Sequence, residues 1–250
     1  MSNYRKYELN LEKSPDDSRD WVIESIMKQN FYPDGWDLRF DLPKIRDQGR
    51  YGTCAAQTAA CMKEWQEKKD IQYSGYMSPQ FVYSLRENKN SPGMYCRDVM
   101  KILSNNGICT EDEFPYETLG EPSEQIIEKA KNHIIKGYAK INTVEGLKKA
   151  LYKYGPCLIA VPVYNKGKMM WKPEYKGQEV QGGHAMTVVG YGNNNFIVRN
   201  SWGDDWGNKG YCKFPFKDWG CQWEVWSTVD AESEEHPKRK VKRYTFLCCQ

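Results

Sequence analysis

One cysteine lies in a sequence context that suits covalent chemistry with a thiol. Cys54 lies in "DQGRYGTCAA", where a loop containing two glycines passes into a run of residues typical of a helix. The thiolate is the nucleophile and a free cysteine titrates near about 8.5, so a catalytic thiol has to be activated. A helix N-terminus and a neighbouring imidazolium both activate a thiol, and the position of Cys54 predicts the first of them. The alternative is an inert, buried thiol.

Of the three histidines, His184 has the surroundings that suit a catalytic base. It lies in "QGGHAMTVVGYG", where two glycines clear space before a strand begins. His133 lies in a segment typical of a helix end at the surface, and His236 lies in the C-terminal tail. Asn200 ends the strand that follows, so we expect its side-chain oxygen to accept the imidazole N–H and fix the ring.

The elements that would position these residues change character along the chain. Apolar spacings of three and four predict a helix with one buried face from Cys54 to Lys69. Helical patterns follow at "SPQFVYSLREN", "CRDVMKILSNNG", "EPSEQIIEKAKNHI" and "LKKALYKYG". Five short strand-like segments come next: "CLIAVPVY", "AMTVVGYG", "NFIVRNSW", "GYCKFPF" and "WEVWSTVD". The sequence therefore predicts an α+β fold of two lobes with a site between them.

These changes in composition divide the chain into four segments. Residues 1–30 are polar and charged and form an N-terminal extension, and residues 31–140 form a mainly helical lobe. Residues 141–230 form a mainly β lobe, and residues 231–250 form a charged C-terminal tail. We expect the two central segments to carry the site.

Bulk composition excludes several classes of protein. The 250 residues are 40% hydrophobic and 28% charged, which is typical of a globular protein. No run approaches the roughly 20 apolar residues of a transmembrane segment, and a net charge of +3 is too small to favour nucleic acid or a membrane as the main partner. No CxxC pair occurs, so we expect no metal, and we expect no cofactor.

The two ends of the chain bear on its location. The N-terminal "MSNYRKYELNLEKSPDD" lacks the apolar core of a secretory signal, which predicts a cytoplasmic protein whose nine cysteines are thiols. Near the other end, the basic run "PKRKVKR" could act in nuclear import or contact nucleic acid or another anionic surface. The alternative is a solvated tail.

Three motifs together resemble those of the papain-like cysteine peptidases: "DQGRYGTCAA", "GGHAMTVVGYG" and "RNSWGDDWGNKGY". Their order is Cys, His, Asn, and His184 and Asn200 follow Cys54 by 130 and 146 residues, within the range of that family. The resemblance covers roughly residues 35–228. It implies a papain-like two-lobed fold, with a helical N-terminal lobe, an antiparallel β-sheet or barrel in the C-terminal lobe, and the active site in the cleft between them.

The resemblance also implies a role for each matching residue. Cys54 would attack the scissile carbonyl of a peptide or protein substrate and form a covalent acyl-enzyme, while His184 would act as base and then acid. Asn200 would orient His184. Gln48 and the Cys54 backbone N–H would donate hydrogen bonds to the oxyanion. Trp202 would cover the His184–Asn200 hydrogen bond. The alternatives are a turn role for Gln48, a strand-end role for Asn200 and a core role for Trp202.

The substrate-binding segment departs from the family pattern. Gly93-Met94 stands where the family has the Gly-Gly pair that binds the substrate backbone. Tyr95, Cys96 and Gly183 are expected to line the pocket for the side chain two residues before the cut. The full set of residues expected to bind substrate is Gly93, Met94, Tyr95, Gly183 and Trp202.

Two further departures concern disulfides and inhibition. Secreted relatives carry a bridged cysteine pair where this sequence has Tyr51 and Ser91, which supports a reducing setting. The extension, residues 1–30, is shorter than the inhibitory pro-segments of those relatives. We hypothesise that it lies in or near the cleft as a short pro-segment and restrains activity.

The residues thus predict a thiol-dependent peptidase, with two alternatives left open. The same Cys-His-Asn machinery could transfer the acyl group to an amine or hydrolyse a non-protein amide. The chain could also be an inactive homologue that binds peptides. That last alternative predicts the loss of Cys54, His184 or Gln48, and all three are present.

Overall fold

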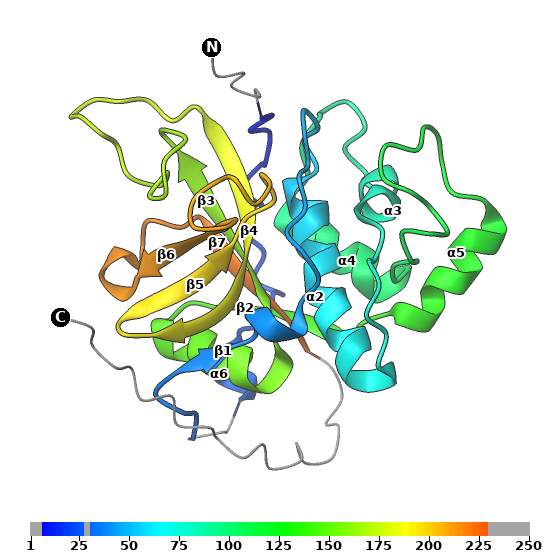
Figure 1. The fold of residues 1–250 in the computed structure, drawn as a ribbon, viewed down its shortest axis with the longest axis horizontal. Helices are drawn as coiled ribbons and strands as arrows, with labels where there is room; N and C mark the ends of the chain where they lie inside the picture. The colour runs from blue at the N-terminus through cyan, green and yellow to red at the C-terminus, as the bar shows by residue number, and fades with distance from the viewer. Residues whose placement is uncertain (1–6, 28–30, 230–250) are drawn as a thin grey trace.

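The computed structural model describes residues 7–27 and 31–229, with a sheet on one side and helices on the other (Figure 1). The basic run "PKRKVKR" and His236 lie outside the described residues. Within the described ranges, no helix is both long and apolar enough to cross a membrane.

The strands form one antiparallel sheet, and that sheet is open. Its strands follow the order β2-β7-β3-β4-β5-β6, and β1 pairs with β4 off this path, so the expected sheet or barrel is a sheet and not a closed barrel. All five predicted strands are present, whereas β1 and β2 are additional. The strands are β1 (Trp36–Asp37), β2 (Gly137–Lys140), β3 (Cys157–Val163), β4 (Gly182–Gly192), β5 (Asn195–Arg199), β6 (Tyr211–Pro215) and β7 (Glu224–Val229).

The helical side is built around one central helix. α2 (Cys54–Ile71) packs against α3 and α4 on one side and against β3 and β4 on the other. The predicted single buried face is therefore wrong, because every residue from Cys54 to Glu67 is buried. The neighbouring helices are α3 (Pro79–Ser84), α4 (Cys96–Asn105) and α5 (Glu124–Ala130), with a 3-10 turn at Lys131–His133.

Side-chain caps explain where two of these helices begin. The Ser78 hydroxyl accepts a hydrogen bond from the Phe81 N–H (3.0 Å) at the start of α3. Likewise, Thr143 accepts from the Gly146 N–H (2.9 Å) at the start of α6 (Val144–Tyr154), which packs against the sheet. Caps of this kind satisfy backbone donors that a helix leaves unpaired.

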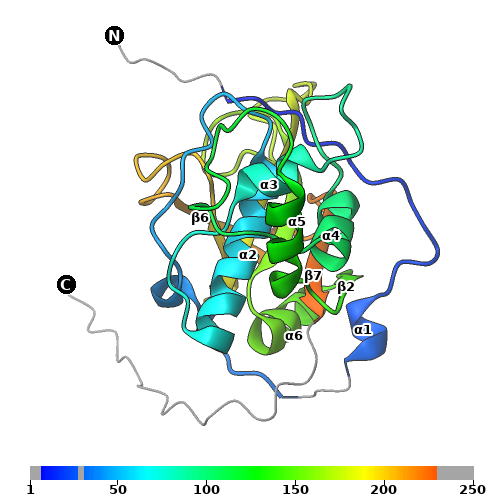
Figure 2. The same cartoon turned by 90° about the vertical axis from the view of Figure 1, so that its right-hand side faces the viewer.

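The N-terminal segment, residues 7–27, packs against the rest of the fold at several points, among them the buried Leu11, Ser14 and Ile23. Figure 2 shows it passing over the top of the view and down one edge to α1 (Ile23–Ile26). Ile23 is fully buried in the apolar core of the sheet side. Asp20 forms an ion pair with Arg97 on α4 (2.5 Å). The part of the segment that contains Asp20 and Ile23 is thus packed into the fold.

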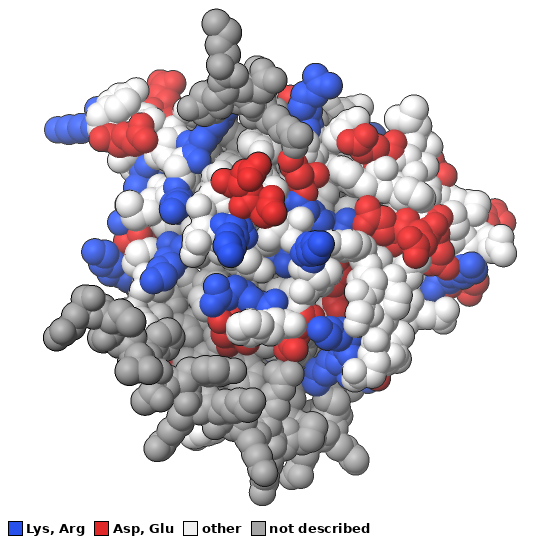
Figure 3. All heavy atoms as spheres, in the orientation of Figure 1, with Lys and Arg blue, Asp and Glu red and all other residues white. Residues whose placement is uncertain are grey.

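Charged side chains of both signs are interspersed on the face in Figure 3. Acidic groups gather on the upper and right parts of this view, and basic groups lie among them at the centre and left. Such a mixed face agrees with the small net charge of +3.

Candidate active site

Cys54 is the first residue of α2, so its sulfur lies at the positive end of the helix dipole. Backbone N–H groups of Ala185, Ala55 and Cys54 itself point at the sulfur. The preceding loop approaches Pro92 closely, since a Cβ on Gly52 would lie 2.2 Å from the Pro92 carbonyl oxygen. Glycine at position 52 therefore allows the loop to reach the start of α2.

His184, near the start of β4, is hydrogen-bonded to Asn200, and both side chains are buried. The distance from His184 Nε2 to Asn200 Oδ1 is 2.7 Å. The Ser201 backbone N–H also donates to Asn200 Oδ1 (2.8 Å), which identifies that atom as the acceptor. His184 Nε2 must then carry the proton, which leaves Nδ1 with the lone pair of a base. Among the described residues, Nδ1 has no hydrogen-bond partner.

Trp202 lies against the imidazole of His184. The two ring centroids are 4.5 Å apart, and the planes are tilted by 31°. Trp206 in turn meets Trp202 edge-on at 5.6 Å. Aromatic rings in this position exclude water from the His184–Asn200 hydrogen bond, whose strength depends on a dry environment.

Gln48 is buried and held at both ends of its side-chain amide. Its Nε2 donates to the Tyr51 carbonyl (2.9 Å), and its Oε1 accepts from the Ser201 hydroxyl (2.7 Å). An amide nitrogen carries two hydrogens, so the second N–H is left to bind an oxyanion. Sequence reasoning missed Ser201, whose only signal is its position next to Asn200.

The buried Arg199 and the partly buried Arg46 hold the loop that carries Gln48. Arg199, at the end of β5, donates to the carbonyls of Pro43 (2.7 Å) and Lys44 (2.6 Å). Arg46 is anchored to Glu64 on α2 (2.8 Å).

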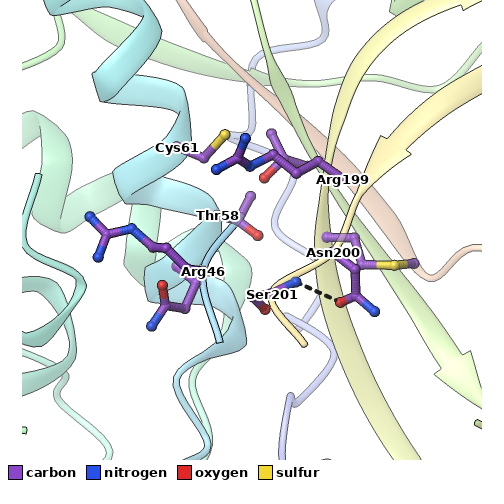
Figure 4. Close-up of a pocket in the computed structure, with 9 residues that line it drawn as sticks. Arg46, Thr58, Cys61, Arg199, Asn200 and Ser201 are labelled. Atoms are coloured by element: carbon purple, nitrogen blue, oxygen red, sulfur yellow. Dashed lines mark hydrogen bonds between the residues drawn. The ribbon is translucent and has the colours of Figure 1, made fainter. Parts of the chain in front are cut away.

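Figure 4 shows Arg46, Arg199 and Asn200 among the residues that line a small cavity. Its volume is about 10 Å³, roughly one water molecule. The cavity is too small for a substrate side chain, so it belongs to the support of the site.

The N-terminal segment runs through the space in front of Cys54. Leu11 donates its N–H to the Gly183 carbonyl (3.3 Å), and Glu12 donates to the Met94 carbonyl (3.2 Å). Asn10 presses on Gly93 so closely that a Cβ there would lie 1.5 Å from the Asn10 carbonyl oxygen. Residues 9–12 thus bridge the helical side and the sheet side.

All five residues predicted to bind substrate contact this part of the chain. Tyr7 stacks on Trp202 with ring centroids 4.6 Å apart, and its hydroxyl donates to the Trp202 carbonyl (3.0 Å). Tyr95 pairs with Glu12, and the other three contact residues 9–12 as described above. Their role in substrate binding stays a prediction. No sequence signal had marked Tyr7.

This covering sets the protonation of Cys54 and His184. Cys54 is 0% exposed, and burial raises its pKa to about 11, although the three N–H groups at the sulfur favour the thiolate. Burial also lowers the pKa of His184 to about 4, against the opposing effect of Asn200. Excluding water disfavours both charges in this covered form. The covered pair is a neutral thiol and a neutral imidazole.

His133 is not the simple surface residue that was predicted. Its side chain is 18% exposed, and its Nδ1 lies 2.8 Å from the carboxylate of Glu67 on α2. The seven cysteines within the described residues are free thiols.

Comparison with known proteins agrees with the geometry. Residues 32–227 match the model of the family described as papain family cysteine protease. An uncharacterized peptidase C1-like protein of Acanthamoeba polyphaga mimivirus is 30% identical, over 82% of this chain and 80% of its own length. Cathepsin K of Mus musculus is 32% identical over 72% of this chain, and the match covers 58% of cathepsin K.

A solved structure has the same fold. Xylellain, a cysteine protease from Xylella fastidiosa, is similar with a TM-score of 0.74 and 25% identity, over 92% of this chain and 99% of xylellain. The family match covers most of the chain and includes Cys54, His184 and Asn200. The chain therefore belongs to the papain family of cysteine proteases.

Proposed function

We propose that the chain hydrolyses peptide bonds through a covalent acyl-enzyme on Cys54. His184 Nδ1 takes the thiol proton as the sulfur attacks the scissile carbonyl carbon. The resulting oxyanion accepts hydrogen bonds from the Cys54 N–H and from the free N–H of Gln48. The imidazolium of His184 then protonates the leaving amine, and water cleaves the thioester by the reverse sequence.

The observation that carries this proposal is the hydrogen bond between His184 Nε2 and Asn200 Oδ1. Because Ser201 fixes which end of the Asn200 amide accepts, the imidazole is left with Nδ1 as its basic nitrogen. Asn200 also stabilises the imidazolium without adding a charge.

We further propose that residues 7–12 restrain this activity by filling the cleft. Support comes from the backbone hydrogen bonds to Gly183 and Met94 and from the burial of Cys54. The segment contacts each of the five residues predicted to bind substrate, so substrate and segment compete for the same space. Residues 13–27 have a different role, because Ile23 fills the sheet-side core.

A fluorogenic peptide library tests the reaction on the full-length chain. The wild type is compared with Cys54→Ser, and products are analysed by mass spectrometry in the presence of an added amine. Turnover that is lost in Cys54→Ser and yields free carboxylic acids supports hydrolysis. Amide products would indicate acyl transfer, and equal turnover by both proteins would refute the role of Cys54.

The substrates of this peptidase are peptides or proteins. We propose a cytoplasmic location on the sequence features alone, and a nuclear import or nucleic-acid contact through "PKRKVKR" has the same basis. Deleting that run and following the location of a tagged chain tests the import role. Measuring how nucleic-acid binding by the chain depends on salt tests the nucleic-acid role, which predicts that binding weakens steeply as salt is added.

A further inference from the structure

The carboxylate of Glu12 is held by three neutral donors on the helical side. The Ser91 hydroxyl donates at 2.6 Å and the Asn88 amide at 3.1 Å. The Tyr95 hydroxyl binds the same carboxylate. These three donors form a cradle for a carboxylate at the rim of the cleft, and the cradle is open to solvent on one side, since Glu12 is only partly buried.

The cradle is held in shape by the loop before α4. The Gly93 N–H donates to Ser91 Oγ (3.1 Å), so the Ser91 hydroxyl hydrogen is free to point at the carboxylate. Arg86 donates to the Ser91 carbonyl (3.4 Å), which places a positive charge behind the loop. The three donors and the nearby guanidinium all favour a negatively charged occupant.

The cradle is adjacent to the apolar position beside Cys54. Asn10 packs on Gly52 and Gly93 at the nucleophile, and Leu11 follows it with its side chain buried in the core that contains Cys54. Glu12 is the third residue outward from the nucleophile. Successive residues of an extended chain point to opposite faces, so Leu11 points inward while Glu12 reaches the rim.

We infer that Asn88, Ser91 and Tyr95 form a subsite that selects substrates with an acidic side chain next to an apolar one. Counted outward from Cys54, the apolar residue stands two positions before the cut and the acidic residue three positions before it. In the chain itself Glu12 follows Leu11, so the segment lies in the cleft in the opposite direction to such a substrate. The inference rests on the proposed peptidase function. In the covered form, Leu11 and Glu12 fill these two subsites in place of the substrate.

The hydrogen bonds of the cradle change the pKa of its present occupant, Glu12. Hydrogen bonds from Ser91, Tyr95 and Asn88 lower the pKa of Glu12 despite the opposing effect of partial burial. The cradle therefore favours the ionised carboxylate over the neutral acid. A glutamine of the same size would keep some of the hydrogen bonds without the charge.

Three coumarin-releasing peptides test the subsite: Ac-Glu-Leu-Ala, Ac-Gln-Leu-Ala and Ac-Lys-Leu-Ala. They are compared at neutral pH on the full-length chain, as wild type and as Leu11→Asp, which opens the cleft. We expect kcat/KM to be about five- to tenfold higher for the Glu peptide than for the Gln peptide, mainly through KM, and lowest for the Lys peptide.

Variants of the cradle identify the residues responsible. Ser91→Ala and Tyr95→Phe should each bring the Glu-to-Gln ratio close to one. Lys89→Ala, an exposed neighbour on the same loop, should leave the ratio unchanged. Turnover of the Glu and Gln peptides at equal kcat/KM would overturn the subsite and leave the peptidase intact. No turnover of any peptide, with Cys54 unmodified, would overturn the proposed function and the subsite with it.

Discussion

The backbone N–H of Leu11 donates to the carbonyl of Gly183, the residue immediately before His184 (3.3 Å). The Gly183 N–H binds the Leu9 carbonyl in return (3.2 Å), so residues 9–11 add to the beginning of β4 as an extra piece of strand. This pairing places the Leu11 side chain in the same core as Cys54. Together with the contacts of Tyr7 and Glu12, this pairing covers the cleft at Cys54 and His184.

Replacing Leu11 by aspartate should uncover Cys54. Burying a charge at this position costs far more than the segment's few backbone hydrogen bonds contribute, so the segment should leave the cleft. We expect iodoacetamide to alkylate Cys54 at neutral pH at least about tenfold faster in Leu11→Asp than in the wild type. Peptide mapping by mass spectrometry measures the rate at this one cysteine.

Lys13→Ala provides the matched control for that experiment. Lys13 is exposed and belongs to the same segment, so its removal should leave the alkylation rate at the wild-type value. Equal rates in Leu11→Asp and the wild type would show that residues 7–12 do not protect the thiol.

Acid should open the cleft through His184. Burial lowers the pKa of His184 to about 4 in the covered form, from an ordinary value of 6.5. The covered form therefore has its full stability above 6.5 and loses it as the pH falls toward 4, because protonation favours the hydrated imidazolium. Hydrogen exchange of the Leu11 amide, corrected for intrinsic rates, should show protection falling over this range. Constant protection from 6.5 to 4 would contradict the mechanism.

Three of the four catalytic candidates, Cys54, His184 and Asn200, could be placed from sequence because each lies in a local motif. Cys54 begins a helix and His184 begins a strand, and the type of each element was readable from its periodicity. Asn200 follows from the strand after β4. Gln48 came from the resemblance, since nothing in its own composition distinguishes it from a turn residue.

The covering of the cleft could not be predicted in the same way. Residues 9–12 bind backbone groups of Met94 and Gly183, which lie far along the chain and carry no side-chain signal. The sequence led only to the hypothesis that residues 1–30 lie near the cleft. β1 and β2 were missed because they have only two and four residues, and α2 was misjudged because polar residues such as Lys63 are buried between the two sides.

Gln48 and Ser201 should differ in how much they affect the chemical step. Gln48→Ala removes an oxyanion donor and should lower kcat by about 10²- to 10³-fold with little change in KM. Ser201→Ala keeps the Gln48 donor but removes the hydrogen bond that holds Gln48 Oε1. We therefore expect kcat to fall by about tenfold or less. Steady-state kinetics on full-length proteins with the Leu11→Asp background measure both. A kcat for Gln48→Ala equal to that of its parent would remove Gln48 from the oxyanion site.

Ile23 should contribute to stability and not to inhibition. Its side chain is 0% exposed in the sheet-side core, whereas Ile26 on the same short helix is 39% exposed. Ile23→Ala should lower the free energy of unfolding by about 2–4 kcal/mol, and Ile26→Ala should change it by about 0.5 kcal/mol or less. Urea unfolding measures both.

Equal effects of the two isoleucine substitutions would show that α1 is not packed into the fold. This test also decides how the extension can be studied. A chain that starts at Phe31 would lose a core side chain together with the cleft segment, so point substitutions separate the two roles better.

The central claim is that the sulfur of Cys54 forms the covalent intermediate. The most direct measurement mixes full-length Leu11→Asp with a peptide ester, quenches the reaction in acid within its first turnovers, and locates the added acyl mass by peptide mapping. We predict an adduct on Cys54 and none in Leu11→Asp/Cys54→Ser. Ester turnover with an adduct on a different residue, or equal turnover without Cys54, would contradict it.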